Sequence, residues 1–212
     1  MRHVSTANVV DGRTARWRGQ RERRRTEIVD TAVEVISRVG PTASVADVVA
    51  ACGITRPVLY RHFDGRDDLD RAIADRCSLM LLDHLQGRLS ADGGIEAGLR
   101  RAVDTYLDFV LQHRHLYDFT RSADRGRPGA EVVDRIRAVV VAVVAAAAAE
   151  LMEEPDELGV PLDDVFAVGL VGMADGVVSH WLSHPDRITR QRMTEGLVSL
   201  LTAAIESVVR PA

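Results

Sequence analysis

The segment from Ser44 to Arg66 carries polar side chains whose types and spacing suit recognition of a nucleic acid. Its second half presents a cluster of side chains with different contact chemistry: Arg56, Val58, Tyr60 and His62. Arginine can grip guanine through two hydrogen bonds, valine can touch the methyl group of thymine, and tyrosine and histidine can donate to phosphate oxygens. The chemistry expected of this segment is therefore the binding of double-stranded DNA.

Two short helices joined by a glycine turn must position these side chains. Ser44 is a good N-cap residue, and Asp47, three positions later, completes a capping box for the first helix. Gly53 can adopt the left-handed backbone that ends a helix and starts a turn. Thr55 is expected to cap the second helix, in whose first turn Pro57 is tolerated. This layout predicts a helix-turn-helix.

The strings around the second helix make the prediction more specific. Leu59 and Phe63 lie four positions apart, so they share the face that packs on the first helix. The segment reads LYRHF and then DGRDDL, and an apolar helical pattern precedes it over Arg25–Gly40. Over roughly Arg21–Leu69, the chain resembles the tetracycline-repressor (TetR) family of bacterial one-component regulators. In that family a Leu-Tyr-x-His-Phe pattern ends the recognition helix, and a basic residue and an acidic pair open the next one.

The resemblance implies an all-α chain of about nine helices. A three-helix helix-turn-helix DNA-binding domain would occupy residues 21–66, and a helical ligand-binding and dimerisation domain would occupy residues 67–212. Residues 1–20 show no helical periodicity, so a flexible basic arm is expected there. This arm either follows DNA phosphates or enters the minor groove, or it is a solvated leader without contacts. The implied partners are a second copy of the chain, a palindromic DNA operator and a small-molecule effector.

Apolar periodicity places the individual helices along the chain. The expected spans, besides the helix-turn-helix, are about residues 21–39, 66–86, 94–113, 116–119, 130–153, 162–183 and 188–209. In the first of them, the expected buried stripe consists of Ile28, Ala32, Val35, Ile36 and Val39.

The expected DNA-binding residues lie in the helix-turn-helix and in the basic stretch before it. They are Ser44, Thr55, Arg56, Pro57, Val58, Tyr60, His62, Arg66, Arg23, Arg24 and Arg25. Arg56 and Val58 are expected to read bases, whereas Tyr60, His62 and Arg66 are expected to hold phosphates. The family usually has lysine where this chain has Arg66, and either residue can hold a phosphate. The family often has a small or hydroxylated residue at the position of Val58, so the preferred base stays open.

The net charge of −4 is divided unevenly along the chain. Residues 1–66 contain 12 Arg against 7 Asp or Glu, a net of +5, and the remaining residues carry a net of −9. A basic head on an acidic body is typical of a DNA-reading domain joined to a domain with another task.

Cysteine usage and hydropathy indicate the compartment. The two cysteines, Cys52 and Cys77, lie on apolar helix faces and are expected to be small buried side chains. No Cys/His cluster suggests zinc, so no metal or cofactor is expected. The N-terminus lacks the apolar core of a signal peptide. The most apolar run, Ala138–Ala149, has 12 residues and is too short to span a bilayer. We therefore expect a cytoplasmic protein.

A ligand pocket is the next expectation from the resemblance. Aromatic residues make up only 4% of the chain, so their placement is informative. The candidate pocket residues are Tyr106, Phe109, His113, Phe119, Phe166, Met173, Asp175, His180 and Trp181. Such a pocket would be largely apolar with a few polar anchors, which suits an apolar or amphipathic effector. Ordinary core packing is the alternative for each residue. Asp175 would anchor a polar group, bond across a dimer, or occupy an exposed helix position.

The family pairs its last two helices with those of a second subunit. The residues expected at this dimer interface are Gly169, Gly172, Gly176, Leu197, Leu201 and Ile205. The small residues would allow close approach of helices, and the apolar residues form a stripe on the final helix. The alternative is that these faces complete the core of the single subunit.

The favoured function is a homodimeric, sequence-specific regulator that represses transcription until a small molecule releases it from DNA. A transcriptional activator and an adaptor that does not bind DNA remain alternatives with the same fold. An enzyme is less favoured, although the candidate acids and bases include His84, Asp104, His113, His115 and His180. They form no nucleophile, metal or phosphate-loop signature, so no catalytic residue is expected.

Overall fold

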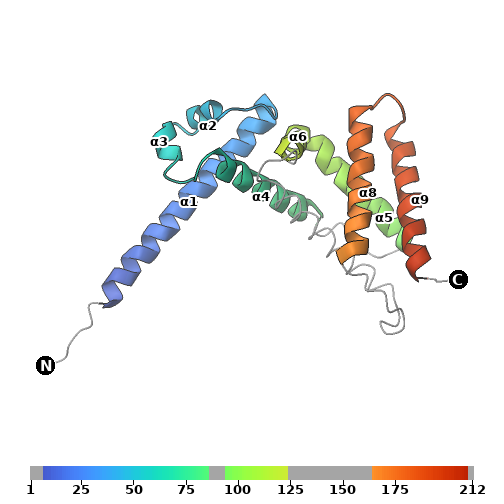
Figure 1. The fold of residues 1–212 in the computed structure, drawn as a ribbon, viewed down its shortest axis with the longest axis horizontal. Helices are drawn as coiled ribbons and strands as arrows, with labels where there is room; N and C mark the ends of the chain where they lie inside the picture. The colour runs from blue at the N-terminus through green and yellow to red at the C-terminus, as the bar shows by residue number, and fades with distance from the viewer. Residues whose placement is uncertain (1–6, 86–93, 124–163, 210–212) are drawn as a thin grey trace. The chain divides into compact units, whose positions relative to one another are not determined.

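The computed structural model describes residues 7–85, 94–123 and 164–209, with side-chain detail for 19–85, 96–122 and 169–206. In these ranges the chain is all-helical, which confirms the expected fold class (Figure 1). The eight helices in these ranges are α1 (Ala7–Val39), α2 (Val45–Ala51), α3 (Arg56–Leu59), α4 (Arg66–Leu85), α5 (Gly94–Gln112), α6 (Arg114–Ala123), α8 (Asp164–Ser183) and α9 (Arg190–Val209).

The chain divides into two compact units. Unit 1 comprises Met1–Cys77 with Arg114–Ala130, and unit 2 comprises Ser78–His113 with Glu131–Ala212. This division is based on how the residues pack. The boundary expected between residues 66 and 67 instead separates DNA binding from regulation, and that boundary stays a prediction. Unit 1 carries the helix-turn-helix.

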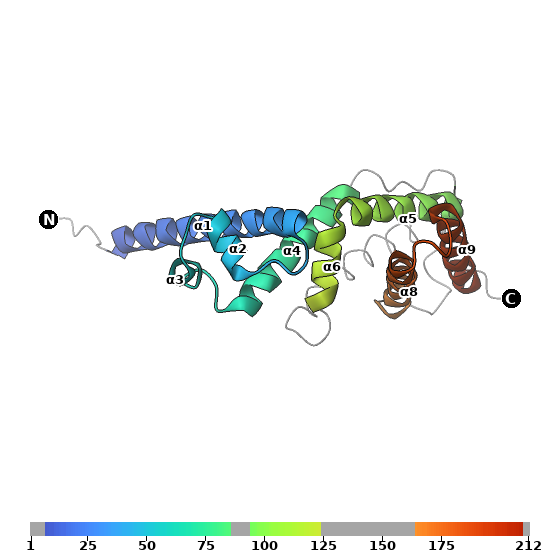
Figure 2. The same cartoon turned by 90° about the horizontal axis from the view of Figure 1, so that it is seen from above.

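In unit 1, α1 packs against α2 and α6 (Figure 2). The predicted stripe on α1 is confirmed for Ile28, Ala32, Val35 and Ile36, all of which are buried. Val39 is 51% exposed, so its assignment to the stripe is wrong. It is the last residue of α1, and the helix ends directly after it at Gly40, whose φ is +109°.

The start of α1 differs from the prediction. The helix begins at Ala7, so the expected start near residue 21 is wrong. Residues 7–20 were expected to be non-helical because they contain Gly12 and Gly19. A single glycine inside a helix costs only about 1 kcal/mol, and the alanines and arginines around these glycines are good helix formers.

A pair of oppositely charged side chains connects α1, the end of α3 and the start of α4. The Arg25 guanidinium donates to both carboxylate oxygens of Asp68, at 2.7 and 2.9 Å. It also donates to the His62 carbonyl oxygen at 2.6 Å and lies over the Phe63 ring, 4.2 Å from its centroid. The same carboxylate accepts a hydrogen bond from the Asp64 backbone N–H at 2.9 Å. The Arg25–Asp68 pair therefore fixes where the second helix of the motif ends.

Unit 2 is built from the second half of α4 with α5, α8 and α9. Helix α9 packs against both α5 and α8. The core of unit 2 includes Leu107, Val110, Val178 and Leu197, each at most 1% exposed.

The helices of unit 2 follow the predicted spans closely, and the piece expected at 116–119 is the longer α6 of unit 1. The helix expected at 130–153 lies outside the described residues. None of the described helices combines the length and the apolar character needed to cross a membrane.

The Arg25–Asp68 pair predicts a pH-dependent loss of stability in Asp68→Asn. The hydrogen bond from Arg25 lowers the pKa of the Asp68 carboxyl below its ordinary value. Because the pKa of Asp68 is lower in the folded than in the unfolded protein, the ionised carboxylate stabilises the fold at pH values above the unfolded pKa, about 3.9. This stabilisation is lost as the pH falls through the pKa of the folded protein. We expect Asp68→Asn to lower the free energy of unfolding at pH 7 by about 2 kcal/mol, with a smaller difference from wild type below pH 4.

Urea titrations at both pH values measure this difference. Asp67→Asn is the matched control, because Asp67 is an exposed neighbour in the same first turn of α4. Equal effects of the two substitutions at pH 7 would contradict a special role for Asp68.

Candidate nucleic-acid interface

The first helix of the motif begins with the predicted capping box. The Ser44 hydroxyl accepts a hydrogen bond from the Asp47 N–H at 3.3 Å, and the Asp47 carboxylate accepts one from the Ser44 N–H at 2.7 Å. The Ser44 hydroxyl also donates to this carboxylate at 2.7 Å, and this bond is the main reason why the pKa of Asp47 is lowered. The Ser44 side chain is therefore committed to the helix start.

The turn between the two helices contains Gly53 at φ +63°, as predicted. Thr55 is the N-cap residue of α3, but its side chain makes no capping hydrogen bond, so the expected capping by its hydroxyl is wrong. Pro57 lies in the first turn of α3, where it leaves no helical hydrogen bond unmade. The exposed Thr55 hydroxyl remains available for contacts outside the chain.

Helix α3 ends at Leu59, so the recognition helix predicted to end in LYRHF is shorter than expected, and the rest of that string forms the turns after it. Burial still divides residues 56–63 into two sides. Leu59 and Phe63 are 0% and 1% exposed, which confirms that they share the face packed into the unit. The opposite side is open: Tyr60 is 45% exposed, and Arg56 and Pro57 are also exposed. Val58 and His62 are half-buried at the edges of that face. The side chains predicted to contact DNA thus flank one exposed surface, which we call the reading face.

The predicted basic residues differ in how far they are engaged within the chain. Arg25 is paired with Asp68, so its side chain stabilises the fold and is not available as a free cation. Arg66 pairs with Asp70 at 2.6 Å and donates a long hydrogen bond to the Ala43 carbonyl oxygen at 3.5 Å. It therefore ties α4 to the loop before α2.

The other arginines of this region are more accessible. Arg24 makes an exposed pair with Glu27 at 2.7 Å. Arg23, Arg56 and Arg61 are exposed, and their side chains have no hydrogen-bonding or ionic partner among the described residues. Arg61 lies in LYRHF between the exposed Tyr60 and the half-buried His62, so it adds an exposed basic side chain to the reading face.

His62 has an unusual environment at the edge of the reading face. Its Nδ1 is buried without a hydrogen-bond partner among the described residues. Burial lowers the pKa of His62, and the nearby Arg21, Arg24, Arg25 and Arg61 lower it further. The imidazole is therefore neutral at pH 7, and a neutral ring donates only one hydrogen bond. His62 suits a single phosphate contact better than a charge pair.

The predicted pocket residues separate into several places. In unit 2, the Tyr106 hydroxyl donates to the Asp175 carboxylate at 3.2 Å, so Asp175 is half-buried and bonded within the subunit. The Phe109 ring lies 4.7 Å from the His113 ring and 5.5 Å from the His84 ring. Burial lowers the pKa of His113, and His84 lowers it further.

The remaining pocket residues do not join this cluster. Phe119 is buried in unit 1, Met173 is half-buried in α8, and the side chain of Phe166 lies outside the described residues. His180 and Trp181 line a separate pocket at the turn between α8 and α9.

The predicted interface residues also separate. Leu197, Leu201 and Ile205 are 1%, 5% and 6% exposed, and they lie in the subunit's own core, the alternative that the sequence left open. The glycines at 169, 172 and 176 lie instead on an exposed face of α8. Leu200, which belongs to the apolar stripe predicted on the final helix, is 54% exposed on α9. Its exposure follows from its position one residue beside the buried stripe of α9.

The candidate acids and bases are engaged separately. Asp104 lies 3.8 Å from Arg190, and His115 forms a hydrogen bond with the Ser37 carbonyl oxygen at 2.9 Å. His84 and His113 flank Phe109. Within the part of the chain that the structure describes, no three His, Cys, Asp or Glu side chains gather where a metal ion could be held.

Comparison with known proteins assigns both halves of the chain to one family. Residues 28–77 match the family model of bacterial regulatory proteins of the tetR family, and residues 95–204 match the tetracyclin repressor-like C-terminal domain. An uncharacterized HTH-type transcriptional regulator of Mycobacterium tuberculosis is 29% identical over 206 residues, covering 94% of this chain and 85% of the relative.

Two further relatives come from Mycolicibacterium smegmatis. The HTH-type transcriptional activator FasR is 26% identical over 89% of this chain and 85% of its own. The HTH-type transcriptional repressor LfrR is 36% identical over 42% of this chain and 47% of its own.

The fold is also similar to that of a solved structure. A tetR-family transcriptional regulator from Streptomyces coelicolor superposes with a TM-score of 0.69 at 23% identity, covering 89% of this chain and 87% of the other. The two family models together span more than half of the chain, from the motif that holds the reading face to α9. The chain therefore belongs to the TetR family of DNA-binding transcriptional regulators.

Proposed function

We propose that the protein is a homodimeric repressor that binds a palindromic operator through its reading face and leaves it when a small amphipathic effector binds. The observation that carries this proposal is the reading face itself, which is open on one side and anchored through Leu59 and Phe63 on the other. A regulator of this family is normally not an enzyme, and its place of action is the cytoplasm, where the DNA is.

The environments of the side chains suggest their roles. Arg56 and Val58 read base edges, because they lie at the start of α3, where a recognition helix enters the major groove. Tyr60, His62 and the unpaired Arg61 contact phosphates, and the Thr55 hydroxyl adds a further donor. Arg25 and Arg66, which are paired with carboxylates, position these groups.

Substitutions on the reading face should weaken operator binding. We expect Arg56→Ala to lower the affinity for the DNA upstream of the protein's own gene by at least about tenfold, the usual cost of one good base contact. Tyr60→Phe should cause a smaller loss, because only the hydroxyl is removed. Band shifts at several salt concentrations measure both effects, and binding should fall steeply with salt as counterions are released.

Arg192→Ala is the matched control for Arg56→Ala, since it removes an exposed arginine from unit 2. Operator affinities that are the same for wild type, Arg56→Ala and Tyr60→Phe would refute the assignment of the reading face.

A homodimer would give the protein two reading faces for two half-sites. The exposed glycines of α8 allow a partner helix to approach closely, and Leu200 offers apolar surface that the subunit itself does not cover. Burial of a leucine side chain contributes roughly 1.5–3 kcal/mol, and a buried unpaired charge is costly.

Leu200→Glu should therefore shift the protein from dimer to monomer in sedimentation velocity. Leu79→Glu is the matched control, because Leu79 is also a leucine of unit 2 that is 54% exposed. The interface would be misplaced if Leu200→Glu stayed dimeric, and a monomeric wild-type protein would overturn the homodimer.

Activation is the second candidate mode. The similarity to the activator FasR spans most of both chains, whereas the similarity to the repressor LfrR covers less than half of each. Deleting the gene and measuring transcripts next to its operator distinguishes the modes. A rise in transcripts supports repression, and a fall supports activation.

A further inference from the structure

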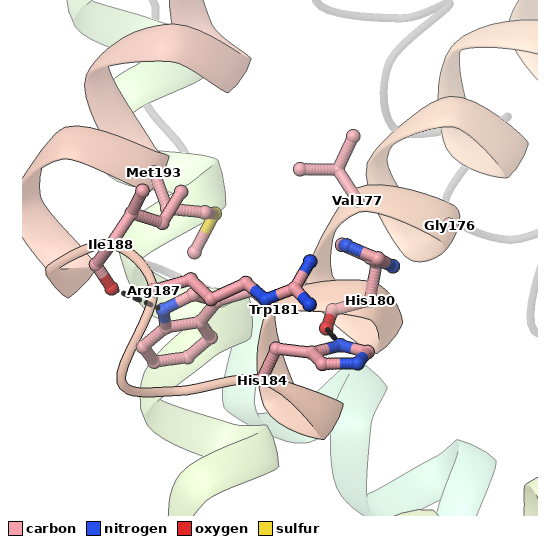
Figure 3. Close-up of a pocket in the computed structure, with 8 residues that line it drawn as sticks. All are labelled: Gly176, Val177, His180, Trp181, His184, Arg187, Ile188 and Met193. Carbon is pink, nitrogen blue, oxygen red and sulfur yellow. Dashed lines mark hydrogen bonds between the residues drawn. The ribbon is translucent and has the colours of Figure 1, made fainter.

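A pocket of about 370 Å³ opens in unit 2 where α8 turns into α9 (Figure 3). This volume is within the range of small-molecule sites, about 300–1,000 Å³. The pocket does not include Tyr106, Phe109, His113 or Asp175. It is therefore a site of its own, apart from the cluster around Phe109.

The inner walls of the pocket are apolar. Trp181 and Met193 are 8% and 2% exposed, and Val177 faces them from α8 (Figure 3). The Trp181 Nε1–H donates to the Ile188 carbonyl oxygen at 3.0 Å, so the polar atom of the indole is already satisfied. Trp181 therefore presents only its apolar ring to a ligand.

The mouth of the pocket is basic. His180 lies in the last turn of α8 and His184 directly follows the helix. Their rings lie 4.7 Å apart, and His184 Nδ1 forms a hydrogen bond with the His180 carbonyl oxygen at 3.1 Å. The Arg187 side chain extends toward the space between Val177 and His180 (Figure 3).

No charged partner satisfies Arg187 in this position. Its guanidinium makes no hydrogen bond or ion pair with any described residue, and no acidic residue lines the pocket. The carboxylate nearest in sequence, Asp186, is exposed and is not part of the lining. A guanidinium beside two imidazoles, above an apolar floor, presents donors that an anion would satisfy.

We propose that this pocket binds a small amphipathic organic anion. Its carboxylate or sulfonate accepts hydrogen bonds from Arg187 and His180, and its apolar part lies against Trp181, Met193 and Val177. If this anion is the effector, its binding also releases the protein from DNA, and only this regulatory consequence rests on the proposed function. Binding itself does not require DNA.

Trp181 is a built-in reporter of binding. The chain has two tryptophans, Trp17 and Trp181, so Trp17→Phe leaves the pocket indole as the single one. Decanoate and 1-decanol are the probes, because they share an apolar chain and differ in the charge of the head group. Calorimetry and Trp181 emission report their binding to the full-length protein below the concentration at which decanoate forms micelles.

We expect one decanoate per chain, bound at least about tenfold more tightly than decanol, since hydrogen bonds to a charged group are stronger than those to a neutral hydroxyl. Arg187→Gln should remove this preference, with little change in decanol binding. Arg192→Gln is the matched control, because it removes an exposed arginine of α9 outside the pocket and should change neither affinity.

Three results would overturn the site: no shift in Trp181 emission, equal affinities for the two probes, or an unchanged preference in Arg187→Gln. A band shift with added decanoate separates the site from its regulatory consequence. Anion binding without release of DNA would refute the effector role and keep the site, whereas binding followed by release would support both.

Discussion

The contact between Arg25 and Asp68 is the constraint on which the DNA-binding unit depends. Helix α3 has only four residues, too few to hold its own direction, and its last turn is stabilised from outside. Arg25 supplies this support through the Asp68 carboxylate, the His62 carbonyl oxygen and the Phe63 ring. Because Arg25 of α1 and Asp68 of α4 stabilise this segment, the solvent-facing side chains of α3 are not needed for its stability and can contact DNA.

This arrangement explains why the basic residues of unit 1 are not equivalent. Arg25 and Arg66 form ion pairs with carboxylates of the same subunit, and these carboxylates largely compensate their positive charges. Arg23, Arg56 and Arg61 have no such partner among the described residues. The positive charge that DNA meets is thus smaller than the arginine count indicates, and it is concentrated around the reading face.

The helical class, the capping box at Ser44 and the packing of Leu59 with Phe63 could be predicted from sequence, since each depends on residues within four positions of one another. The partner of Arg25 and the contact of Arg66 with the Ala43 carbonyl oxygen could not, because Asp68 and Ala43 lie 43 and 23 positions away along the chain. The same limit applies to Leu197 and Leu201. Their apolar stripe suits a subunit core and a dimer interface equally, and only the packing of α5 on α9 distinguishes the two.

Helix α1 runs from the basic stretch before Arg25 into the hydrophobic core. One continuous helix carries the buried stripe from Ile28 to Ile36 and the arginines that precede Arg25. At 1.5 Å per residue, the segment from Ala7 to Arg25 extends about 27 Å beyond the Arg25–Asp68 pair, so a tilt of about 10° would displace its tip by about 5 Å. A small rotation of α1 about its buried stripe would therefore move the arginine-rich N-terminal part of the helix over a larger distance.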